Sequence, residues 1–301
     1  MEELMGSFLH ARRLFCLTSF SILLALLVAC GTRGETAVSA TATSLPATFT
    51  PLPSPTPPLQ PTTAVSQAAT PEPSEAAAGV AVEEAILISQ PGPGSRIVNG
   101  PLQVMGVADP TFEQNLVIRL LLADGTELAV TPTTIQAELG NRGPFAVEIP
   151  FTVTDEQQAF VQVYATSARD GGITHLASVG LTLADSGEEQ IVLVEPHAER
   201  IQISQPALGD TISGGTVTVA GEALASFEQT LVVELLDEAG EVLSSQPIIV
   251  AAPDLGQPGL FSIELSYEVA GSMSGRVVVH DPSPAFGGDV HLASVEVTLA
   301  P

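Results

Sequence analysis

The stretch FEQNLVIRLLLADG at residues 112–125 returns as FEQTLVVELLDEAG at residues 227–240, 115 positions later along the chain. After a one-residue slip in the following loop, the offset becomes 116, so that Phe145 corresponds to Phe261. Self-similarity at a fixed offset is the sequence signature of a duplicated structural unit. The chain is therefore built mainly of two copies of one domain.

The repeat predicts domains at residues 86–183 and 201–299, joined by an inter-domain linker at 184–200. Each copy is about a hundred residues long, which is enough for a hydrophobic core of its own. The linker contains four consecutive aliphatic residues, Ile191 to Val194. We expect these to form a short strand or to pack at the domain junction.

Apolar residues alternate with polar ones in both copies, which predicts strands with one buried face. The alternating positions of the best-matched strand are Leu116, Ile118, Leu120 and Leu122 in the first copy, and Leu231, Val233 and Leu235 in the second. Asp124-Gly125 is a hairpin signal, because both residues tolerate a positive φ.

Seven or so short strands in about a hundred residues, separated by Gly, Pro and Asp turns, predict an all-β chain with two tandem immunoglobulin-like β-sandwich domains. These domains follow a signal peptide and a disordered Pro/Thr-rich tether. The Cys…Trp…Cys hallmark of antibody domains is missing, so fibronectin-like or other sandwich topologies remain open.

Residues 1–30 are typical of an export signal, with Arg12-Arg13 before an apolar stretch that is short for a membrane span. The stretch ends in Leu27-Val28-Ala29-Cys30, which resembles the lipobox of bacterial lipoproteins. The resemblance implies that Cys30 carries the lipid. An ordinary secretory signal, or a single anchor helix with a chance cysteine, is the alternative.

Residues 31–80 are a low-complexity run of Thr, Ala, Pro and Ser that cannot bury a core. Such a segment is a solvated linker, partly of polyproline character. Together with the lipobox it predicts domains held away from a membrane by a tether, lipid-anchored and facing the extracellular or periplasmic side.

The chain has 9 basic residues against 34 acidic ones, a formal net charge of -25 at pH 7. Nucleic acid is excluded as a partner, because its binding requires clustered cations that neutralise phosphate. Both cysteines, Cys16 and Cys30, precede the domains. A disulfide, a cysteine zinc site or a thiol nucleophile within the domains is therefore excluded.

His175 and His291 occupy matching positions at the start of the last strand of each copy, with Asp170 and Asp289 nearby in sequence. A hydrolase would need a nucleophile, a base and an orienting acid in one pocket. Ser178 lies three residues after His175, and side chains at that spacing point to opposite faces of a strand. We therefore expect these histidines to cap a sandwich edge, with no catalytic role.

Scattered acids offer little for a metal ion. A calcium site needs several oxygens converging from one loop, whereas Asp109, Glu113 and Asp124 are spread along the first copy, and Leu224 replaces Asp109 in the second. Glu113 and its counterpart Glu228 are better explained by a hydrogen bond to a nearby turn. The chain also has no His/Cys metal spacing and no phosphate-binding glycine loop, so we predict no metal and no cofactor.

Further motifs recur in both copies: Ile-x-Ile-x-x-Pro, then Gly106-Val107-Ala108 or Gly221-Glu222-Ala223 after the second strand, then Phe-Glu before an aliphatic strand, and a Gly-rich turn before the last strand. This order resembles the immunoglobulin-like domain of bacterial spore-germination proteins. The resemblance covers about two thirds of the chain. It implies an all-β module on envelope lipoproteins, and it implies no catalytic residue.

These features predict a non-catalytic, surface-exposed lipoprotein that acts as a binding or structural module of the cell envelope, related to spore germination or to envelope processes. The alternative is an accessory lipoprotein subunit of a transporter or of an envelope hydrolase, and an enzyme in its own right is the third class. The predicted partners are the membrane, through the lipid, and a protein of the envelope. A small-molecule ligand is disfavoured, because Trp is absent and sugar binding relies on exposed aromatic platforms.

Overall fold

The computed structural model describes residues 82–225 and 228–301, so the predicted signal peptide, Cys30 with its lipobox (Leu27, Val28, Ala29) and the tether lie outside the described residues. Within the described part the regular elements are β-strands, apart from one 3-10 turn, η1, at Phe112–Gln114. The all-β prediction is confirmed.

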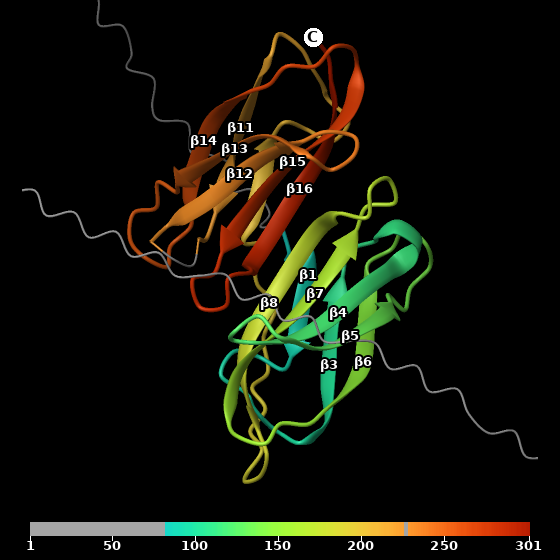
Figure 1. Cartoon of the computed structure of the whole chain (residues 1–301), viewed down its shortest axis with the longest axis vertical. Coiled ribbons are helices and arrows are strands. Elements are labelled where there is room, and N and C mark those ends of the chain that lie inside the picture. Colours follow the sequence, from blue (N-terminus) through green and yellow to red (C-terminus); the bar gives the residue numbers. More distant parts are fainter. Residues whose placement is uncertain (1–81, 226–227) are drawn as a thin grey trace, which may run out of the picture. The chain divides into compact units, whose positions relative to one another are not determined.

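The first sandwich packs a three-stranded sheet, in the order β1-β3-β6, against a sheet in the order β8-β7-β4-β5 (Figure 1). The short strand β2 adds to β8 in parallel. The bounds of these strands are β1 Ile86–Gln90, β2 Arg96–Val98, β3 Gly100–Ala108, β4 Asn115–Leu122, β5 Glu127–Thr134, β6 Gly143–Phe151, β7 Gln157–Thr166 and β8 Ile173–Ala184.

The second sandwich repeats this plan, with β14-β11-β9 in one sheet and β13-β12-β15-β16 in the other. Here β10 adds to β16 in parallel, as β2 does to β8. Its strands are β9 Ile201–Gln205, β10 Thr211–Ile212, β11 Thr216–Ala223, β12 Thr230–Leu236, β13 Val242–Ile249, β14 Gly259–Ser266, β15 Met273–Pro282 and β16 Asp289–Leu299.

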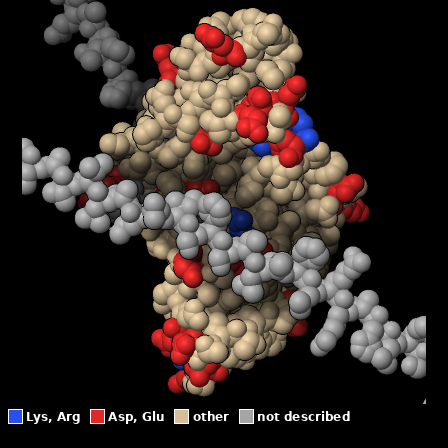
Figure 2. Space-filling view, viewed as in Figure 1, with Lys and Arg blue, Asp and Glu red and all other residues tan. Residues whose placement is uncertain are grey.

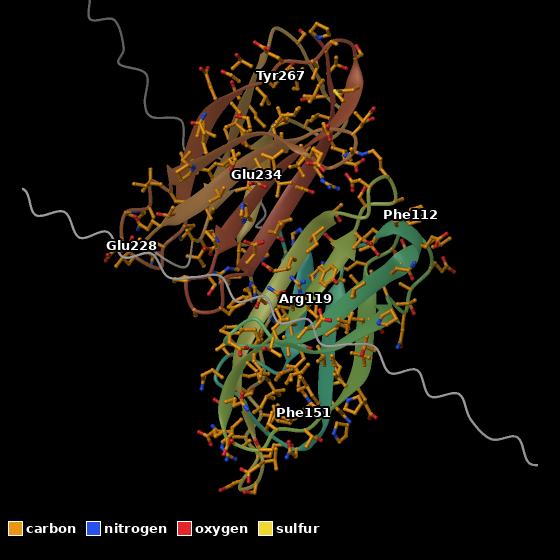
Figure 3. The ribbon with its side chains drawn as sticks, in the orientation of Figure 1. Phe112, Arg119, Phe151, Glu228, Glu234 and Tyr267 are labelled. Atoms are coloured by element: carbon orange, nitrogen blue, oxygen red, sulfur yellow. The ribbon has the colours of Figure 1, made fainter. Side chains whose placement is uncertain are left out.

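The alternating residues of the sequence form the two cores. In β4, Leu116, Ile118 and Leu120 are fully buried, and each sandwich has its own hydrophobic cluster. Phe151 and Tyr267, labelled in Figure 3, close the two cores. Tyr267 is buried, and its hydroxyl lies within hydrogen-bond distance of two backbone carbonyl oxygens, those of Ile212 and Ala300.

The repeated Gly-x-Ala motif has a steric cause. A Cβ added to Gly106 would lie 2.1 Å from the Leu87 carbonyl oxygen and 2.5 Å from the ring of Phe145. A Cβ added to Gly221 would likewise lie 2.0 Å from the Gln202 carbonyl oxygen and 2.7 Å from the ring of Phe261. The register of β1 against β3 shifts beside this glycine, at a bulge that brings the backbone close.

The inter-domain linker does not form the strand that four aliphatic residues suggested. Instead Val192 and Val194 lie against Gly92 of the first sandwich, where the Gly92 N–H donates to the Val192 carbonyl at 2.7 Å. Ile191 and Leu193 remain exposed. The chain between the copies is therefore packed along the first sandwich.

Both sandwiches fall within one compact unit, because their last strands pair with each other. β16 runs antiparallel to β8, with His291 opposite Ala177, Leu292 opposite Leu176 and Ala293 opposite His175. Leu176 and Leu292 are equivalent residues of the repeat, as are the two histidines. The pairing therefore has an approximate two-fold axis at the Leu176–Leu292 pair, like an isologous dimer interface within one chain.

Candidate functional site

Four polar side chains meet at this two-fold junction: Glu84, His175, Glu199 and His291, called here the junction cluster. They are two pairs of repeat equivalents, since Glu84 corresponds to Glu199 and His175 to His291. Each sandwich contributes one carboxylate and one imidazole. The two copies thus place identical residues face to face.

The backbone fixes both glutamates. Each lies just before the first strand of its sandwich, where Glu83 and Ala198 form an antiparallel bridge. The Glu84 N–H donates to the His197 carbonyl, and the Glu199 N–H donates to the Val82 carbonyl. This second crossing of the two copies obeys the same approximate two-fold relation as the pairing of β8 with β16.

The four side chains contact one another closely. Nε2 of His291 lies 2.6 Å from a carboxylate oxygen of Glu199, and Nδ1 of the same ring lies 3.2 Å from Glu84. Nε2 of His175 is 3.5 Å from Glu199, and the two imidazole rings meet edge to face at 5.1 Å between centroids. One potential ligand atom from each residue lies within 4.8 Å of those of the other three.

The cluster is almost wholly removed from water, with Glu84 and His291 2% and 1% exposed. Burial raises the pKa of Glu84. Burial also opposes ionisation of Glu199, but the hydrogen bond from His291 and the influence of His175 lower its pKa to about 2. Burial, aided by His291, lowers the pKa of His175 to about 4. A neutral His175 has a lone pair available, and His ring nitrogens and carboxylates are common metal ligands.

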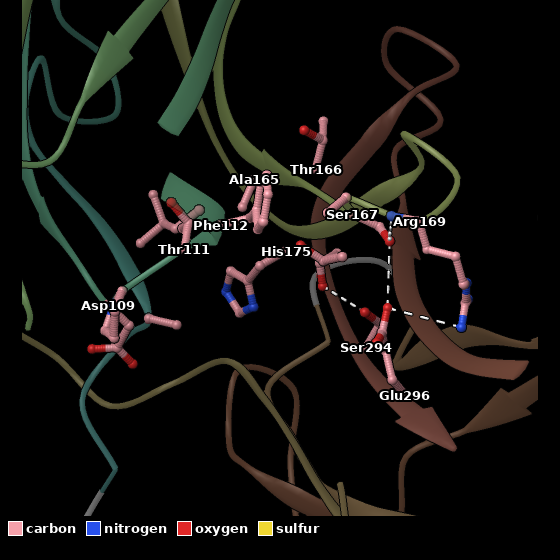
Figure 4. A pocket seen from close by; sticks show the side chains of 15 residues that line it. Asp109, Thr111, Phe112, Ala165, Thr166, Ser167, Arg169, His175, Ser294 and Glu296 are labelled. Atoms are coloured by element: carbon pink, nitrogen blue, oxygen red, sulfur yellow. Dashed lines mark hydrogen bonds and ion pairs between the residues drawn. The ribbon is translucent and has the colours of Figure 1, made fainter. Parts of the chain in front are cut away.

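A pocket of about 470 Å³ opens beside the cluster, with His175 in its wall. Figure 4 shows His175 between Phe112 and Ser294. Phe112 is 59% exposed at this rim. On the opposite wall Ser167 and Arg169 contact the carboxylate of Glu296. The pocket thus combines one exposed aromatic ring with a polar wall.

The junction has a second pair of equivalent contacts, but with different chemistry on its two sides. Arg276 of β15 donates to Asp170 at 2.9 Å, and both side chains are buried. The repeat equivalents of these residues are Phe160 and Phe286, whose rings stack at 3.9 Å between centroids. One side is therefore an ion pair and the other an aromatic pair.

The acids and serines near the histidines do not assemble a catalytic triad. Asp170 is taken by Arg276, and Asp289 lies 2.6 Å from Nδ1 of His280. Ser294 donates to the Thr174 carbonyl. The expectation that the histidines cap a sandwich edge is wrong in one respect. The strands that carry them, β8 and β16, pair with each other and so leave no open edge at this point.

In the first copy, the Phe-Glu-Gln turn uses its glutamine rather than its glutamate for side-chain hydrogen bonds. Glu113 and Gln114 both adopt left-handed backbone conformations, as do Glu228 and Gln229. The buried Gln114 amide donates to the carbonyls of Glu138 and Asn141, which fixes the loop between β5 and β6. Glu113 only reaches the Asn115 amide, at 3.5 Å.

The scattered acids of the first copy do not converge. Asp109 pairs with Arg142, and Asp124 accepts a hydrogen bond from the Thr126 N–H within its own hairpin. Among residues 82–225 and 228–301, the junction cluster is the one group of three or more ligating side chains close enough to share an ion.

A search for local metal spacing missed the junction cluster, because the Glu and His of each copy are about ninety residues apart in sequence. Glu84 and Glu199 were not singled out at all. The sequence did contain a signal for them. Glu84 and Glu199 occupy equivalent positions of the repeat, as His175 and His291 do.

Acidic side chains are spread over the face seen in Figure 2, with few basic ones between them. Among the described residues, no helix has the length and apolar character needed to cross a membrane.

The sequence matches the family described as the immunoglobulin-like domain of bacterial spore germination twice, over residues 85–172 and 200–288. The chain belongs to this family. Each match covers its sandwich up to the last strand, β8 or β16, which lies just beyond the matched residues. Each sandwich therefore contains one germination-type immunoglobulin-like domain, a binding or structural module of a non-catalytic fold family. No curated protein matches the sequence.

Solved structures resemble the chain only distantly. A red sea bream transglutaminase matches 72% of the chain at 10% identity, with a TM-score of 0.27. Latent PorU from Porphyromonas gingivalis matches 76% at 14% identity with a TM-score of 0.26. The chain spans 31% and 21% of these two proteins. The periplasmic chaperone SfaE is covered over 99% of its length, at 13% identity and a TM-score of 0.22.

Proposed function

We propose that this chain is a lipid-anchored, non-catalytic binding module of the bacterial cell envelope, related to spore germination, in which two immunoglobulin-like domains act as one body. The pairing of Leu176 with Leu292 carries this proposal, because it joins the larger sheets of the two sandwiches into one ten-stranded sheet. A module of this kind presents both copies in a fixed relation to a partner.

The partner that fits this module is a protein with a basic surface. The excess of acidic residues disfavours anionic partners and favours basic ones through electrostatic complementarity. The outer edges of the joined sheet, β5 and β13, contain Pro132 and Pro247. Because proline removes a backbone donor, binding by strand addition is disfavoured at these edges. The exposed Phe112 at the rim of the pocket is the better anchor.

The lipid anchor rests on the sequence before Cys30. Cell fractionation and labelling with a fatty-acid probe test it: the wild-type chain should be labelled and sediment with membranes, and Cys30→Ala should lose both properties. Labelling that persists in Cys30→Ala would contradict the anchor.

The partner surface is tested by site-specific crosslinking in intact cells. Phe112→Asp should abolish the crosslinked product formed by the wild-type chain. Leu208→Asp changes a side chain that is 79% exposed on the second sandwich, outside the pocket, and should leave the product unchanged. If both variants keep the product, Phe112 is not the anchor.

A further inference from the structure

The junction cluster has the composition of a metal site rather than of an ordinary buried ion pair. In the described part of the chain, the ion pairs of Glu84 and Glu199 are all made to histidines. Two buried carboxylates without a permanent cation are costly, since taking a charge out of water carries a penalty of several kcal/mol. A divalent cation would neutralise both.

Two polar atoms of the cluster also lack a hydrogen-bond partner. Nε2 of His175 and Nδ1 of His291 are buried and make no contact with hydrogen-bond geometry, although each lies within ion-pair distance of a carboxylate. Buried polar atoms normally have partners, so an unsatisfied imidazole nitrogen beside carboxylates calls for an explanation. A metal ion accepts a lone pair from such a nitrogen, and this explains the atom without a further protein contact.

We propose that Glu84, His175, Glu199 and His291 bind one divalent transition-metal ion of the zinc type, which links the two sandwiches. Two imidazoles and two carboxylates are ligands of the kind that zinc takes, and four of them complete a tetrahedral shell. Calcium does not fit, because it requires six to eight oxygen ligands. With four protein ligands the site is closed and structural.

The spacing of the ligand atoms agrees with this assignment. With bonds of about 2.0–2.2 Å, tetrahedral ligands lie about 3.4 Å apart. The separation of 3.5 Å between Nε2 of His175 and a carboxylate oxygen of Glu199 is close to that value, and one ligand atom from each of the four residues lies within 4.8 Å of the others. With Nε2 of His291 as its ligand atom, the ion replaces the 2.6 Å hydrogen bond between this nitrogen and Glu199.

Backbone groups already hold the carboxylates in place. The Ala85 N–H donates to Glu199 at 2.7 Å, and the Arg200 N–H donates to Glu84 at 3.1 Å. Such outer hydrogen bonds orient ligands and are a regular part of metal sites. They run across the junction, since each donor immediately precedes the first strand of the other sandwich. The ion would therefore strengthen contacts that the fold has already made.

Zinc binding by the full chain is measured by competition with a chromophoric chelator. We expect one ion per chain, and a loss of affinity of at least about a hundredfold in His175→Gln and in Glu199→Gln, since even outer-shell changes cost 10–100-fold. His280→Gln is the matched control, because His280 pairs with Asp289 outside the cluster. It should bind as the wild type does. Equal affinity in all four chains would overturn the proposal.

The Co²⁺ form of the wild-type chain provides a test that does not depend on folding of the variants. Four-coordinate nitrogen and oxygen ligands should give intense visible d–d bands without a thiolate charge-transfer band. A thiolate band would place the ion at Cys16 or Cys30, and weak bands would indicate an octahedral surface ion. Either result would overturn the site.

Discussion

The guanidinium of Arg276 donates to the carboxylate of Asp170 across the junction at 2.9 Å, with the two side chains 1% and 2% exposed. On the other side of the approximate two-fold axis the same positions hold Phe160 and Phe286. The duplicated interface has thus kept its backbone pairing while the two equivalent contacts differ in chemistry. The aromatic pair shows which apolar residues this backbone geometry accepts.

Breaking the ion pair should be costly, because it leaves a buried charge without a partner. Arg276→Ala is expected to lower the free energy of unfolding by about 3–5 kcal/mol. The double variant Asp170→Phe with Arg276→Phe copies the aromatic side and should be no less stable than the wild type, since replacing a buried pair by packed apolar residues is often neutral or better. Nε and Nη1 of Arg276 are also unsatisfied.

Urea denaturation of the three chains, which are the wild type, Arg276→Ala and the double variant, checks this. The prediction fails if the double variant is less stable than the wild type. In that case the two sides of the junction are not interchangeable. The aromatic pair that is stable at Phe286 would then not be tolerated at the equivalent position, Asp170.

The pairing of His280 with Asp289 should make stability depend on pH. Burial opposes protonation of His280, but the hydrogen bond and charge of Asp289 raise its pKa above the ordinary value. A histidine whose pKa is raised in the folded state contributes to the stability of that state. This contribution is complete below the pKa of the unfolded state, about 6.5, and is lost as pH rises through the pKa of the folded state. The stability difference between wild type and His280→Gln should therefore be larger at about pH 5.5 than at about pH 8.5.

Denaturation curves at both pH values measure this difference. Asp289→Asn should reduce the pH dependence, because Asp289 makes the largest contribution that raises the pKa of His280. A difference that is constant between the two pH values, or that grows toward alkaline pH, would contradict the assignment.

Replacing either motif glycine should damage its own sandwich. In Gly106→Ala and Gly221→Ala the new methyl group collides with a backbone carbonyl and a phenylalanine ring. Overpacking of this kind costs about 1–3 kcal/mol or more. Gly271→Ala is the control, because a Cβ there meets nothing within 4 Å and its φ is not positive. Thermal melts should show lower midpoints for the two motif variants and an unchanged or higher one for the control.

The strands of the core could be predicted because each buries one face, so that Leu116, Ile118 and Leu120 alternate with polar residues. β5 and β13 were not predicted. They are outer strands with little burial, rich in Thr and Ser, and each contains a proline, so they show no clean alternation. Alternation of apolar and polar residues indicates a strand with one buried face. It therefore does not reveal a strand that has little buried surface.

The junction could not be predicted from local pattern. The pairing of Leu176 with Leu292 joins residues 116 positions apart, and nothing in either strand's own alternation indicates that its edge is covered. The repeat offset identified the matching histidines correctly. It did not indicate that the two copies face each other, because a tandem repeat fits separate domains equally well.

The fixed register of β8 against β16 is the central claim, and disulfide formation tests it most directly. In a chain with Cys16→Ser and Cys30→Ser, the pair Leu176→Cys with Leu292→Cys should oxidise readily, because opposed Cα atoms about 4.5–5.5 Å apart fall within the range that a disulfide spans. The pair Leu176→Cys with Glu296→Cys is displaced by about 13 Å along the strand and should stay reduced. Equal cross-linking of both pairs, or of neither, would show that the two sandwiches are not held in this register.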